Sequence, residues 1–310
     1  MATQKMEPDY WIELESTYKH QVQHRKEIVA MNTTDVMQVL PGSELACREL
    51  MEMVIQFLCA RYPRQFTLRD GTLTNHILST TYDVFSIDPL QLLLENVPED
   101  FAIMLRDPVS GTYKFRAGII CASTGWNLGV KIGKGLPEIH EPVPDYKERM
   151  QLSMDRQISF FTKMPTSKPV QRAAWGFEVG QHLYMPPHHP DLDLRDAQDP
   201  NLQPEDIFFR VDWQTLRRLP LSGAIVFNFK AFFYPVVDFK HEPYIPSLSL
   251  KVLNDSKDGL LRYKQLYHVE HVLRPLLLQY KQSQIERRMI RPDWEPATLE
   301  ESPFFPGWTI

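Results

Sequence analysis

The order of the predicted elements limits this 310-residue chain to few folds, because strand-like segments occupy its middle and helix-like segments lie on either side. Phe101–Leu105 and Tyr113–Ala122 flank Asp107-Pro108-Val109-Ser110-Gly111, whose turn residues predict a hairpin. Three further strands are predicted, at Val170–Val179, Ile207–Leu216 and Gly223–Tyr234. A run of strands between runs of helices predicts an α+β fold with an antiparallel sheet and argues against a doubly wound parallel sheet.

The clearest predicted helix follows the turn Pro41-Gly42-Ser43. Ser43 suits an N-cap, Glu44 suits the first helical turn, and Pro63 ends the segment. The apolar residues between these limits recur at helical spacing, at Cys47, Leu50, Met51, Val54 and Leu58. The segment therefore predicts a helix that packs one face against the core.

Three other helices are predicted. Asp88-Pro89 is typical of an N-cap followed by proline at the first helical position, and it opens a short helix over Leu90–Asn96. Asp145 opens another, which ends before Pro165. The last runs from Leu260 to about Arg287, with a break expected at Pro275. We expect residues 1–40 to form an N-terminal extension, residues 41–290 a single domain and residues 291–310 a tail.

Charge and composition exclude several classes of protein. With 34 basic and 39 acidic side chains the formal net charge is −5, so no nucleic-acid partner is expected. The most apolar stretch, residues 224–237, contains Lys230 and Pro235 and falls short of the ~18 uncharged residues that span a bilayer. The first 30 residues contain no apolar core of a secretory leader. The three cysteines, Cys47, Cys59 and Cys121, form neither a disulfide framework nor a CxxC metal site, so a cytoplasmic location is expected.

The segment from Gly125 to Tyr146 carries the most chemical information. It joins a predicted strand to a predicted helix, a position where sites are often built, and its four glycines permit close approach of a ligand to the backbone. Lys131 and Lys134 add positive charge, which favours an anionic ligand. The segment is not a Walker A loop, because the spacing from Gly129 to Lys134 is one residue short of that motif.

His140 is the candidate metal ligand of this segment. It lies between Ile139 and Pro142-x-Pro144, and the prolines limit the conformations of the neighbouring backbone. A neutral, firmly held imidazole suits an axial ligand of haem iron. A hydrogen-bonded structural histidine beside two solvated lysines is the alternative that these residues leave open. His268-x-x-His271 could likewise chelate zinc, although a solvated helix face is the simpler interpretation.

The same segment resembles the haem-dependent oxidative N-demethylase family. The resemblance rests on Trp126-x-Leu128-Gly129-x-Lys131-Ile132-Gly133-Lys134 followed by Ile139-His140-x-Pro142-Val143-Pro144-x-Tyr146. Weaker matches occur in the expected order over about residues 10–285, at Ala46, Glu49-Leu50, Arg61-Tyr62-Pro63-x-x-Phe66, Arg172-x-x-Trp175, Gln214-Thr215-Leu216-x-Arg218-Leu219-Pro220, Gly223-Ala224-x-Val226-Phe227 and Tyr263-Lys264.

The resemblance implies a PAS-like antiparallel sheet, elaborated by N-terminal and C-terminal helices, that binds haem b. Members of such a family oxidise an N-methyl group of a small alkylamine with dioxygen and release formaldehyde. A separate reductase, which uses NADPH, FMN and an iron–sulfur cluster, would supply the electrons, and this sequence has no motif for those cofactors. A non-catalytic haem-binding or ligand-sensing PAS-like protein is the alternative, and a cofactor-free structural protein is a third.

Site residues follow from the resemblance by position. His140 would be the axial ligand of the iron, and Trp126 would lie at the haem. On charge grounds, Lys131, Lys134 and Arg172 would bind the haem propionates. Asp212 is the candidate acid that orients a protonated amine, and Tyr146 is a second candidate catalytic residue.

Three positions depart from the family pattern. This chain has Asp212-Trp213 before Gln214, where the family has Glu-Arg, and Ala174 where the family has Asn. A shorter carboxylate and a tryptophan in place of arginine are expected to reshape the substrate pocket.

Overall fold

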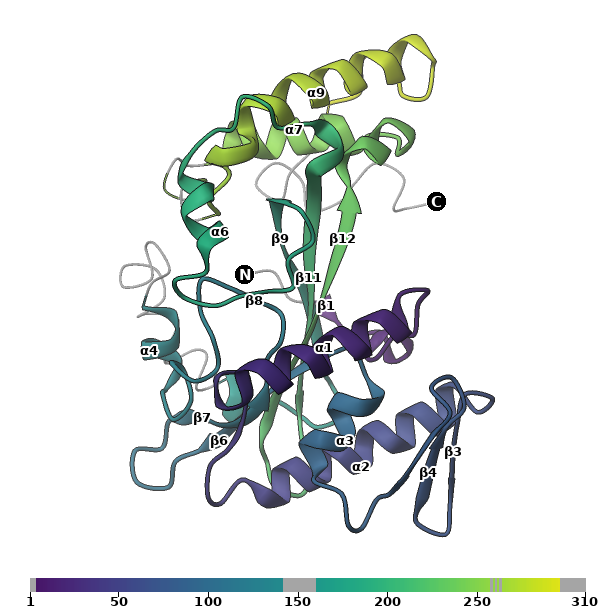
Figure 1. Ribbon diagram of the computed structural model, residues 1–310, viewed down its shortest axis with the longest axis vertical. Helices are drawn as coiled ribbons and strands as arrows, with labels where there is room; N and C mark the ends of the chain where they lie inside the picture. Colours follow the sequence, from purple (N-terminus) through teal and green to yellow (C-terminus); the bar gives the residue numbers. More distant parts are fainter. Residues whose placement is uncertain (1–3, 142–159, 257–258, 260, 262–263, 296–310) are drawn as a thin grey trace. The chain divides into compact units, whose positions relative to one another are not determined.

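A computed structural model describes residues 4–141, 160–256, 259, 261 and 264–295 of the chain (Figure 1). The chain divides into two compact units, described separately below. Unit 1 comprises residues 1–174, 183–187 and 212–231, and unit 2 comprises residues 175–182, 188–211 and 232–310. The limits expected above for the extension, the domain and the tail stay a prediction.

A seven-stranded sheet has the order β1-β9-β11-β12-β6-β7-β2. The pairs β1–β9, β12–β6, β6–β7 and β7–β2 are antiparallel, which confirms the predicted α+β fold with an antiparallel sheet. The predicted hairpin and the three long predicted strands are all present. Their bounds and those of the other strands of this sheet are β1 Gln4–Lys5, β2 Met37–Val39, β6 Asp100–Arg106, β7 Tyr113–Ile119, β9 Val170–Val179, β11 Ile207–Arg218 and β12 Ile225–Pro235.

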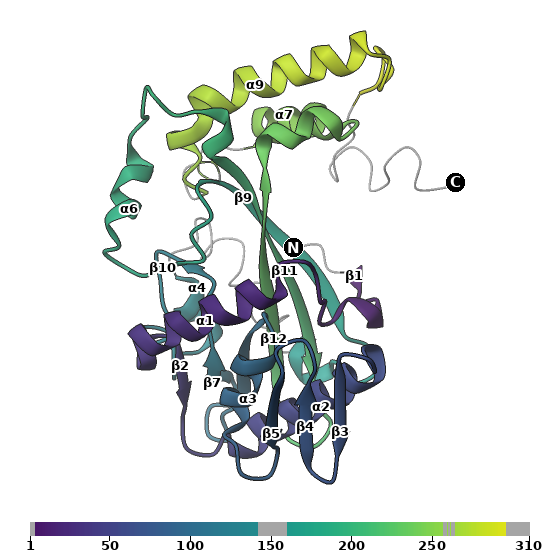
Figure 2. The same cartoon turned by 45° about the vertical axis from the view of Figure 1, so that its right-hand side comes forward.

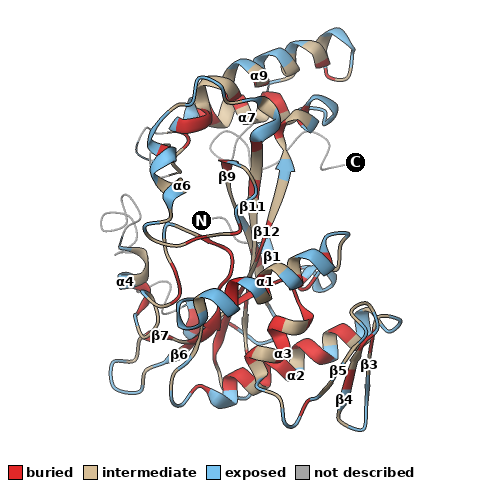
Figure 3. Ribbon diagram, in the orientation of Figure 1, coloured by how far each residue is buried: buried red, intermediate tan, exposed pale blue. Residues whose placement is uncertain are grey.

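The longer helices described in unit 1 are α1 (Tyr18–Asn32), α2 (Glu44–Arg61) and α3 (Pro89–Asn96). Helix α2 contacts both α3 and a small sheet of β3 (Phe66–Arg69), β4 (Thr72–Asn75) and β5 (Thr80–Asp83), as Figure 2 shows. Buried residues are frequent in α2 and α3 (Figure 3). Both predicted helices are present, and α2 packs one face on the core as predicted.

The two predicted helix starts have different chemistry. The Asp88 carboxylate accepts hydrogen bonds from the backbone N–H groups of Leu90 and Gln91, so it is a true N-cap of α3. Ser43 precedes α2, as predicted, but its hydroxyl donates to the Leu40 carbonyl and makes no capping hydrogen bond. The turn itself, with Gly42 at φ +88°, therefore sets the start of α2.

Unit 2 contains α6 (Pro190–Asp193), α7 (Ile245–Asp255) and α9 (Tyr267–Glu286), and Figure 1 shows α7 and α9 side by side. Its core includes Phe177, Phe239 and Leu273. No helix in the described ranges has both the length and the apolar character needed to cross a bilayer.

Several local predictions were wrong or incomplete. Helix α1 lies inside the predicted N-terminal extension, and β3–β5 and α7 were not predicted. Helix α9 begins at Tyr267 and continues through Pro275, so the predicted break is absent. The helix predicted from Asp145 lies almost entirely outside the described residues.

One face of the sheet in unit 1 forms the base of the candidate site. Side chains of a buried apolar cluster come from β6, β7, β11 and β12, and Leu128 and Leu136 pack onto them from the segment after β7. We call this the loop face of the sheet. The remaining short elements near it are β8 (Ser123–Thr124), β10 (Tyr184–Met185) and α4 (Leu136–His140).

Candidate functional site

The segment after β7 is fastened to the edge of that strand opposite β6. Strand β2 pairs with the C-terminal part of this edge, and the Leu40 N–H continues the pairing by donating to the Arg116 carbonyl. The next part is covered by the segment itself, because the Gly133 N–H donates to the Phe115 carbonyl (2.7 Å) and the Phe115 N–H donates to the Lys134 carbonyl (2.9 Å). The sheet thus determines where the predicted site segment lies.

One glycine of the segment is favoured by its backbone conformation, and another lies close to a neighbouring residue. Gly133 has φ +80°, a left-handed conformation that side chains rarely adopt. Gly129 lies against Asp35, and a Cβ atom there would be 2.8 Å from Asp35 Oδ1. The N–H groups of Leu128 and Gly129 both donate to the Asp35 carbonyl, which fastens the first half of the segment.

Helix α4 presents His140. The Gly135 N–H donates to Glu138 Oε2 (2.8 Å), and Pro137 occupies the first turn, where its missing N–H is not needed. Leu136 and Ile139 pack on the apolar cluster of the loop face. Because Leu136 and His140 are four residues apart on a helix, His140 lies beside Leu136, next to this anchored side of α4.

The imidazole of His140 has one defined tautomer. Its Nδ1 lies 2.8 Å from the Leu136 carbonyl oxygen, and a carbonyl can only accept, so Nδ1 carries the proton. Burial lowers the pKa of His140, and the nearby charges of Lys131 and Arg172 lower it further, while the bond to Leu136 opposes them. In the neutral form that this favours, the lone pair is on Nε2, the nitrogen that a metal binds.

Lys131 and Trp126 form a cation–π pair. The Lys131 Nζ atom lies 3.8 Å from the centroid of the Trp126 ring. Burial lowers the pKa of Lys131 to about 8, and the charge of Lys134, which is itself exposed, acts in the same direction. No carboxylate in the described ranges forms an ion pair with either lysine.

Arg172 approaches from β9. Its Nε atom donates to Gln214 Oε1 on β11 (2.6 Å), and its guanidinium carbon lies 5.7 Å from the centroid of the Phe227 ring on β12. Burial lowers the pKa of Arg172, which remains charged at physiological pH. Sequence reasoning counted Gln214 only as a family match and missed its role as a partner of Arg172.

One cation–π contact and the electrostatic effects on His140 and Lys131 place five of the predicted site residues in one neighbourhood of unit 1. Lys131 contacts Trp126, and its charge lowers the pKa of His140. The charge of Lys134 lowers the pKa of Lys131, and that of Arg172 lowers the pKa of His140. We call this set the cation cluster, with the members Trp126, Lys131, Lys134, His140 and Arg172. The structure does not describe Tyr146.

Strand alternation separates Asp212 from Trp213. Side chains of a strand point alternately to its two faces, so Asp212, Gln214 and Leu216 share the loop face. Trp213 lies on the opposite face with Thr215, whose hydroxyl bonds to Asn228 (3.1 Å). Of the two departures in this strand, the shorter carboxylate at 212 is therefore the one on the side of the cation cluster.

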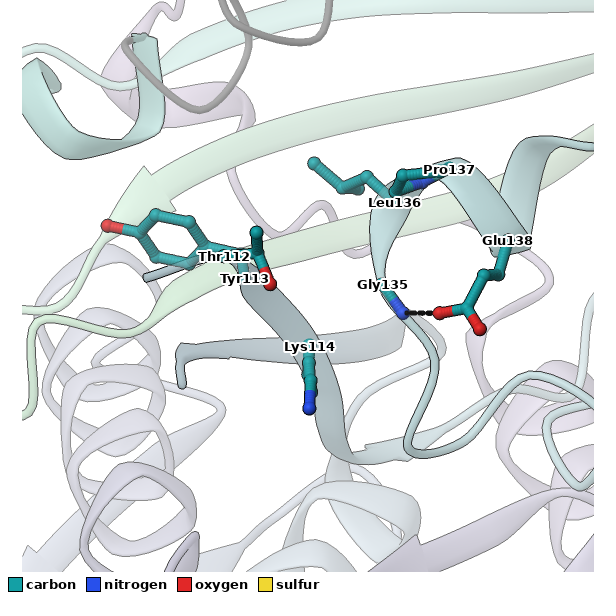
Figure 4. Close-up of a pocket in the computed structure, with 7 residues that line it drawn as sticks. All are labelled: Thr112, Tyr113, Lys114, Gly135, Leu136, Pro137 and Glu138. Carbon is teal, nitrogen blue, oxygen red and sulfur yellow. Dashed lines mark hydrogen bonds between the residues drawn. The ribbon is translucent and has the colours of Figure 1, made fainter. Parts of the chain in front are cut away.

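A small cavity lies at the start of α4 (Figure 4). It has a volume of about 180 Å³ and is lined by residues 112–114 and 135–138. Its walls are mainly apolar, and Figure 4 shows the hydrogen bond between two of its lining residues, Gly135 and Glu138. The lining includes no member of the cation cluster.

The alternative metal motif does not form a site. His268 is buried, its Nδ1 donates to the Gln265 carbonyl (2.7 Å), and burial lowers its pKa to about 4. His271 Nε2 donates to the Asp199 carbonyl (2.8 Å). The described part of the chain contains no group of three or more His, Cys, Asp or Glu residues that could hold a metal ion.

Comparison with known proteins shows the family of this chain. A family model described as haem-dependent oxidative N-demethylase, alpha subunit-like, matches residues 2–274. The match covers most of the chain, including every member of the cation cluster and Asp212, and it agrees with the resemblance found from the sequence motifs.

Proposed function

The chain belongs to the haem-dependent oxidative N-demethylase, alpha subunit-like family, and from this premise we propose that it binds haem b through His140 and oxidatively demethylates a small alkylamine. The observation that carries the proposal is the hydrogen bond between His140 Nδ1 and the Leu136 carbonyl, which leaves the lone pair on Nε2. A PAS-like arrangement of the sheet and a cytoplasmic location are parts of the same proposal.

The cation cluster fits the chemistry of haem. Haem carries its own ring nitrogens, so it needs only an axial ligand from the protein, which a single neutral histidine supplies. Its two propionates are anions, and Lys131, Lys134 and Arg172 offer charge-assisted hydrogen bonds to them. The Trp126 ring adds a flat apolar surface for a planar ligand. A free metal ion would instead need several protein ligands.

The residues of this chain would bind the haem, orient it and balance the charge of its propionates. When bound, haem supplies the activation of dioxygen that oxidation of an N-methyl group requires. His140 would hold the iron as a neutral ligand, and the cations would fix the orientation of the ring by its propionates. Conversion of a methylamine and dioxygen into the demethylated amine, formaldehyde and water consumes two electrons and two protons. We propose that a separate reductase, with NADPH, FMN and an iron–sulfur cluster, supplies the electrons.

Asp212 is the proposed partner of the amine. A protonated alkylamine is a cation, and a carboxylate is the side chain that best offsets its charge when water is excluded. The shared face of Asp212 and Gln214 on β11, with Gln214 bonded to Arg172, supports a position for Asp212 near the cation cluster. Tyr146 remains a proposed second catalytic residue.

The test is formaldehyde release from haem-loaded protein. We expect release from small N-methylated amines in the presence of dioxygen and a reductant, and a loss of activity in Asp212→Asn at unchanged haem content. Asp70→Asn, at an exposed turn of unit 1, is the matched control. Haem-loaded protein that turns over none of a panel of such amines contradicts the enzymatic proposal and favours the haem-binding or ligand-sensing alternative.

A further inference from the structure

The hydrogen bond between Arg172 and Gln214 suggests a role for Gln214. The inference drawn from it rests on the proposed function and extends it. We propose that Gln214 is a positioning residue, which orients the guanidinium of Arg172 toward a haem propionate without neutralising its charge. Gln214 would act on the ligand only through Arg172.

Two neighbours define the plane of the Arg172 guanidinium. Gln214 Oε1 accepts from Nε at 2.6 Å, which fixes one edge of the plane. The Phe227 ring lies 5.7 Å from the guanidinium carbon and supports the group through a cation–π contact. The three residues lie on β9, β11 and β12, which are neighbouring strands of one sheet, so the pairing of these strands sets their relative positions.

The charge of Arg172 acts where the proposed ligand would bind. It is close enough to His140 to contribute to the lowered pKa of that imidazole. Gln214 engages only Nε, and Nη1 and Nη2 carry the other four N–H donors of the side chain. A carboxylate binds well to two parallel N–H groups of an arginine, so a fixed guanidinium plane also fixes where a carboxylate is bound.

The amide of Gln214 has a specific advantage over a carboxylate. A glutamate at this position would accept the same hydrogen bond, but its negative charge would offset that of Arg172 and disfavour a second anion. A neutral amide accepts the hydrogen bond without placing a negative charge beside Arg172, so it does not compete with a propionate for that cation.

The test compares two porphyrins. Apoprotein is titrated with haemin and with haemin dimethyl ester, whose propionates carry no charge, and binding is followed by the Soret absorption. We expect Gln214→Glu and Gln214→Ala to weaken haemin binding roughly ten- to a hundredfold, the range for hydrogen bonds to charged groups. Binding of the dimethyl ester should change by less than about twofold. Gln56→Glu, an exposed position on α2, controls for the added charge.

A double-mutant cycle tests whether Gln214 acts through Arg172. In an Arg172→Met background, Gln214→Ala should have no further effect on haemin affinity. Circular dichroism checks that each variant is folded. If Gln214→Ala does not fold, the near-isosteric Gln214→Glu replaces it in the cycle. Equal losses for haemin and its ester, additive losses in the cycle, or unchanged haemin affinity would each overturn the inference. If the wild-type protein binds haemin through His140 and the Gln214 variants bind haemin equally well, the inference about Gln214 fails and the proposed function stands.

Discussion

The Leu136 carbonyl oxygen lies 2.8 Å from Nδ1 of His140, one helical turn further along α4. This contact assigns the ring proton to Nδ1 and the lone pair to Nε2. It depends on the fold of α4 and on the packing of Leu136 and Ile139, which hold the helix on the loop face of the sheet. The chemistry proposed for His140 therefore has its origin in the way that the segment after β7 is fastened to the sheet.

The first prediction concerns the state of His140 in the apoprotein. We expect the neutral Nδ1–H tautomer and a pKa below the ordinary 6.5, because burial and the charges of Lys131 and Arg172 disfavour the imidazolium ion. Nitrogen-15 chemical shifts across a pH titration measure both quantities, and the signals are assigned by their loss in His140→Gln. A protonated Nε2 at neutral pH, or a pKa above 6.5, contradicts the geometry described for α4.

Lys131 is predicted to make haemin affinity depend on alkaline pH. Its pKa of about 8 in the apoprotein is lowered by burial, and a bound propionate would raise it again. Affinity should therefore fall as pH rises above about 8, by at most tenfold per pH unit. Titrations with haemin at pH 7 and pH 9.5 measure the difference.

Lys131→Arg tests the origin of that dependence, because arginine keeps its charge throughout this range. The variant should lose most of the decline between pH 7 and pH 9.5, whereas Lys163→Met, at an exposed position, should behave as wild type. An identical decline in Lys131→Arg would show that another group is responsible.

Glu49 is predicted to stabilise the turn between β11 and β12. It is buried on α2, and its carboxylate accepts from the Leu221 and Ser222 N–H groups and from the Ser222 hydroxyl. Glu49→Ala should lower the free energy of unfolding by about 3 kcal/mol, because it leaves these donors without their charged acceptor. Glu52→Ala, an exposed change on the same helix, should cost less than about 1 kcal/mol in urea unfolding. Equal effects of the two changes contradict this role.

Glu99 is predicted to make the protein less stable as pH rises from about 4.5 to 7. Burial raises the pKa of Glu99 to about 7, although Lys230 and the Glu13 N–H favour the charged form. The folded state therefore binds more protons than the unfolded state in this window, so the free energy of unfolding decreases with pH. The contribution of Glu99 to the free energy of unfolding is fully present below pH 4.5 and is lost above pH 7. The total change is about 3 kcal/mol.

Glu99→Gln isolates this contribution. The amide keeps an oxygen for the Glu13 N–H but does not titrate, so the variant should gain stability relative to wild type between pH 5 and pH 8 in urea unfolding. Glu52→Gln at an exposed position should show no such gain. A relative stability of Glu99→Gln that stays constant or falls over this range contradicts a buried, protonated Glu99.

Elements with strong local signals were predictable from the sequence. The turn before Glu44, the Asp88 N-cap and the alternating apolar residues of β9 each determine an element through interactions within a few residues. Helix α1 lacked such a signal, because its buried side includes the charged Arg25, which pairs with Asp100 at 2.9 Å. Proline normally disrupts a helix, but at Pro275 the neighbouring Leu273 and Leu277 are buried in the core of unit 2, and the helix continues.

The site was predictable only in part. The motif resemblance predicts His140 and the cations as site residues, and this assignment stays a prediction. The contacts that give them their chemistry depend on three-dimensional register: Gln214 meets Arg172 because β11 lies beside β9, and Leu136 meets His140 because residues 136–140 form a helix within a segment expected to be a loop. Such contacts join residues whose pairing no local pattern reveals.

The absorption spectrum of protein expressed with excess haem tests the central claim most directly. We predict a Soret band in the wild type, a shifted or lost band in His140→Gly, and its recovery when imidazole is added to replace the missing ligand. Colourless wild-type protein contradicts haem binding, and a His140→Gly spectrum identical to that of the wild type contradicts ligation of the iron by His140.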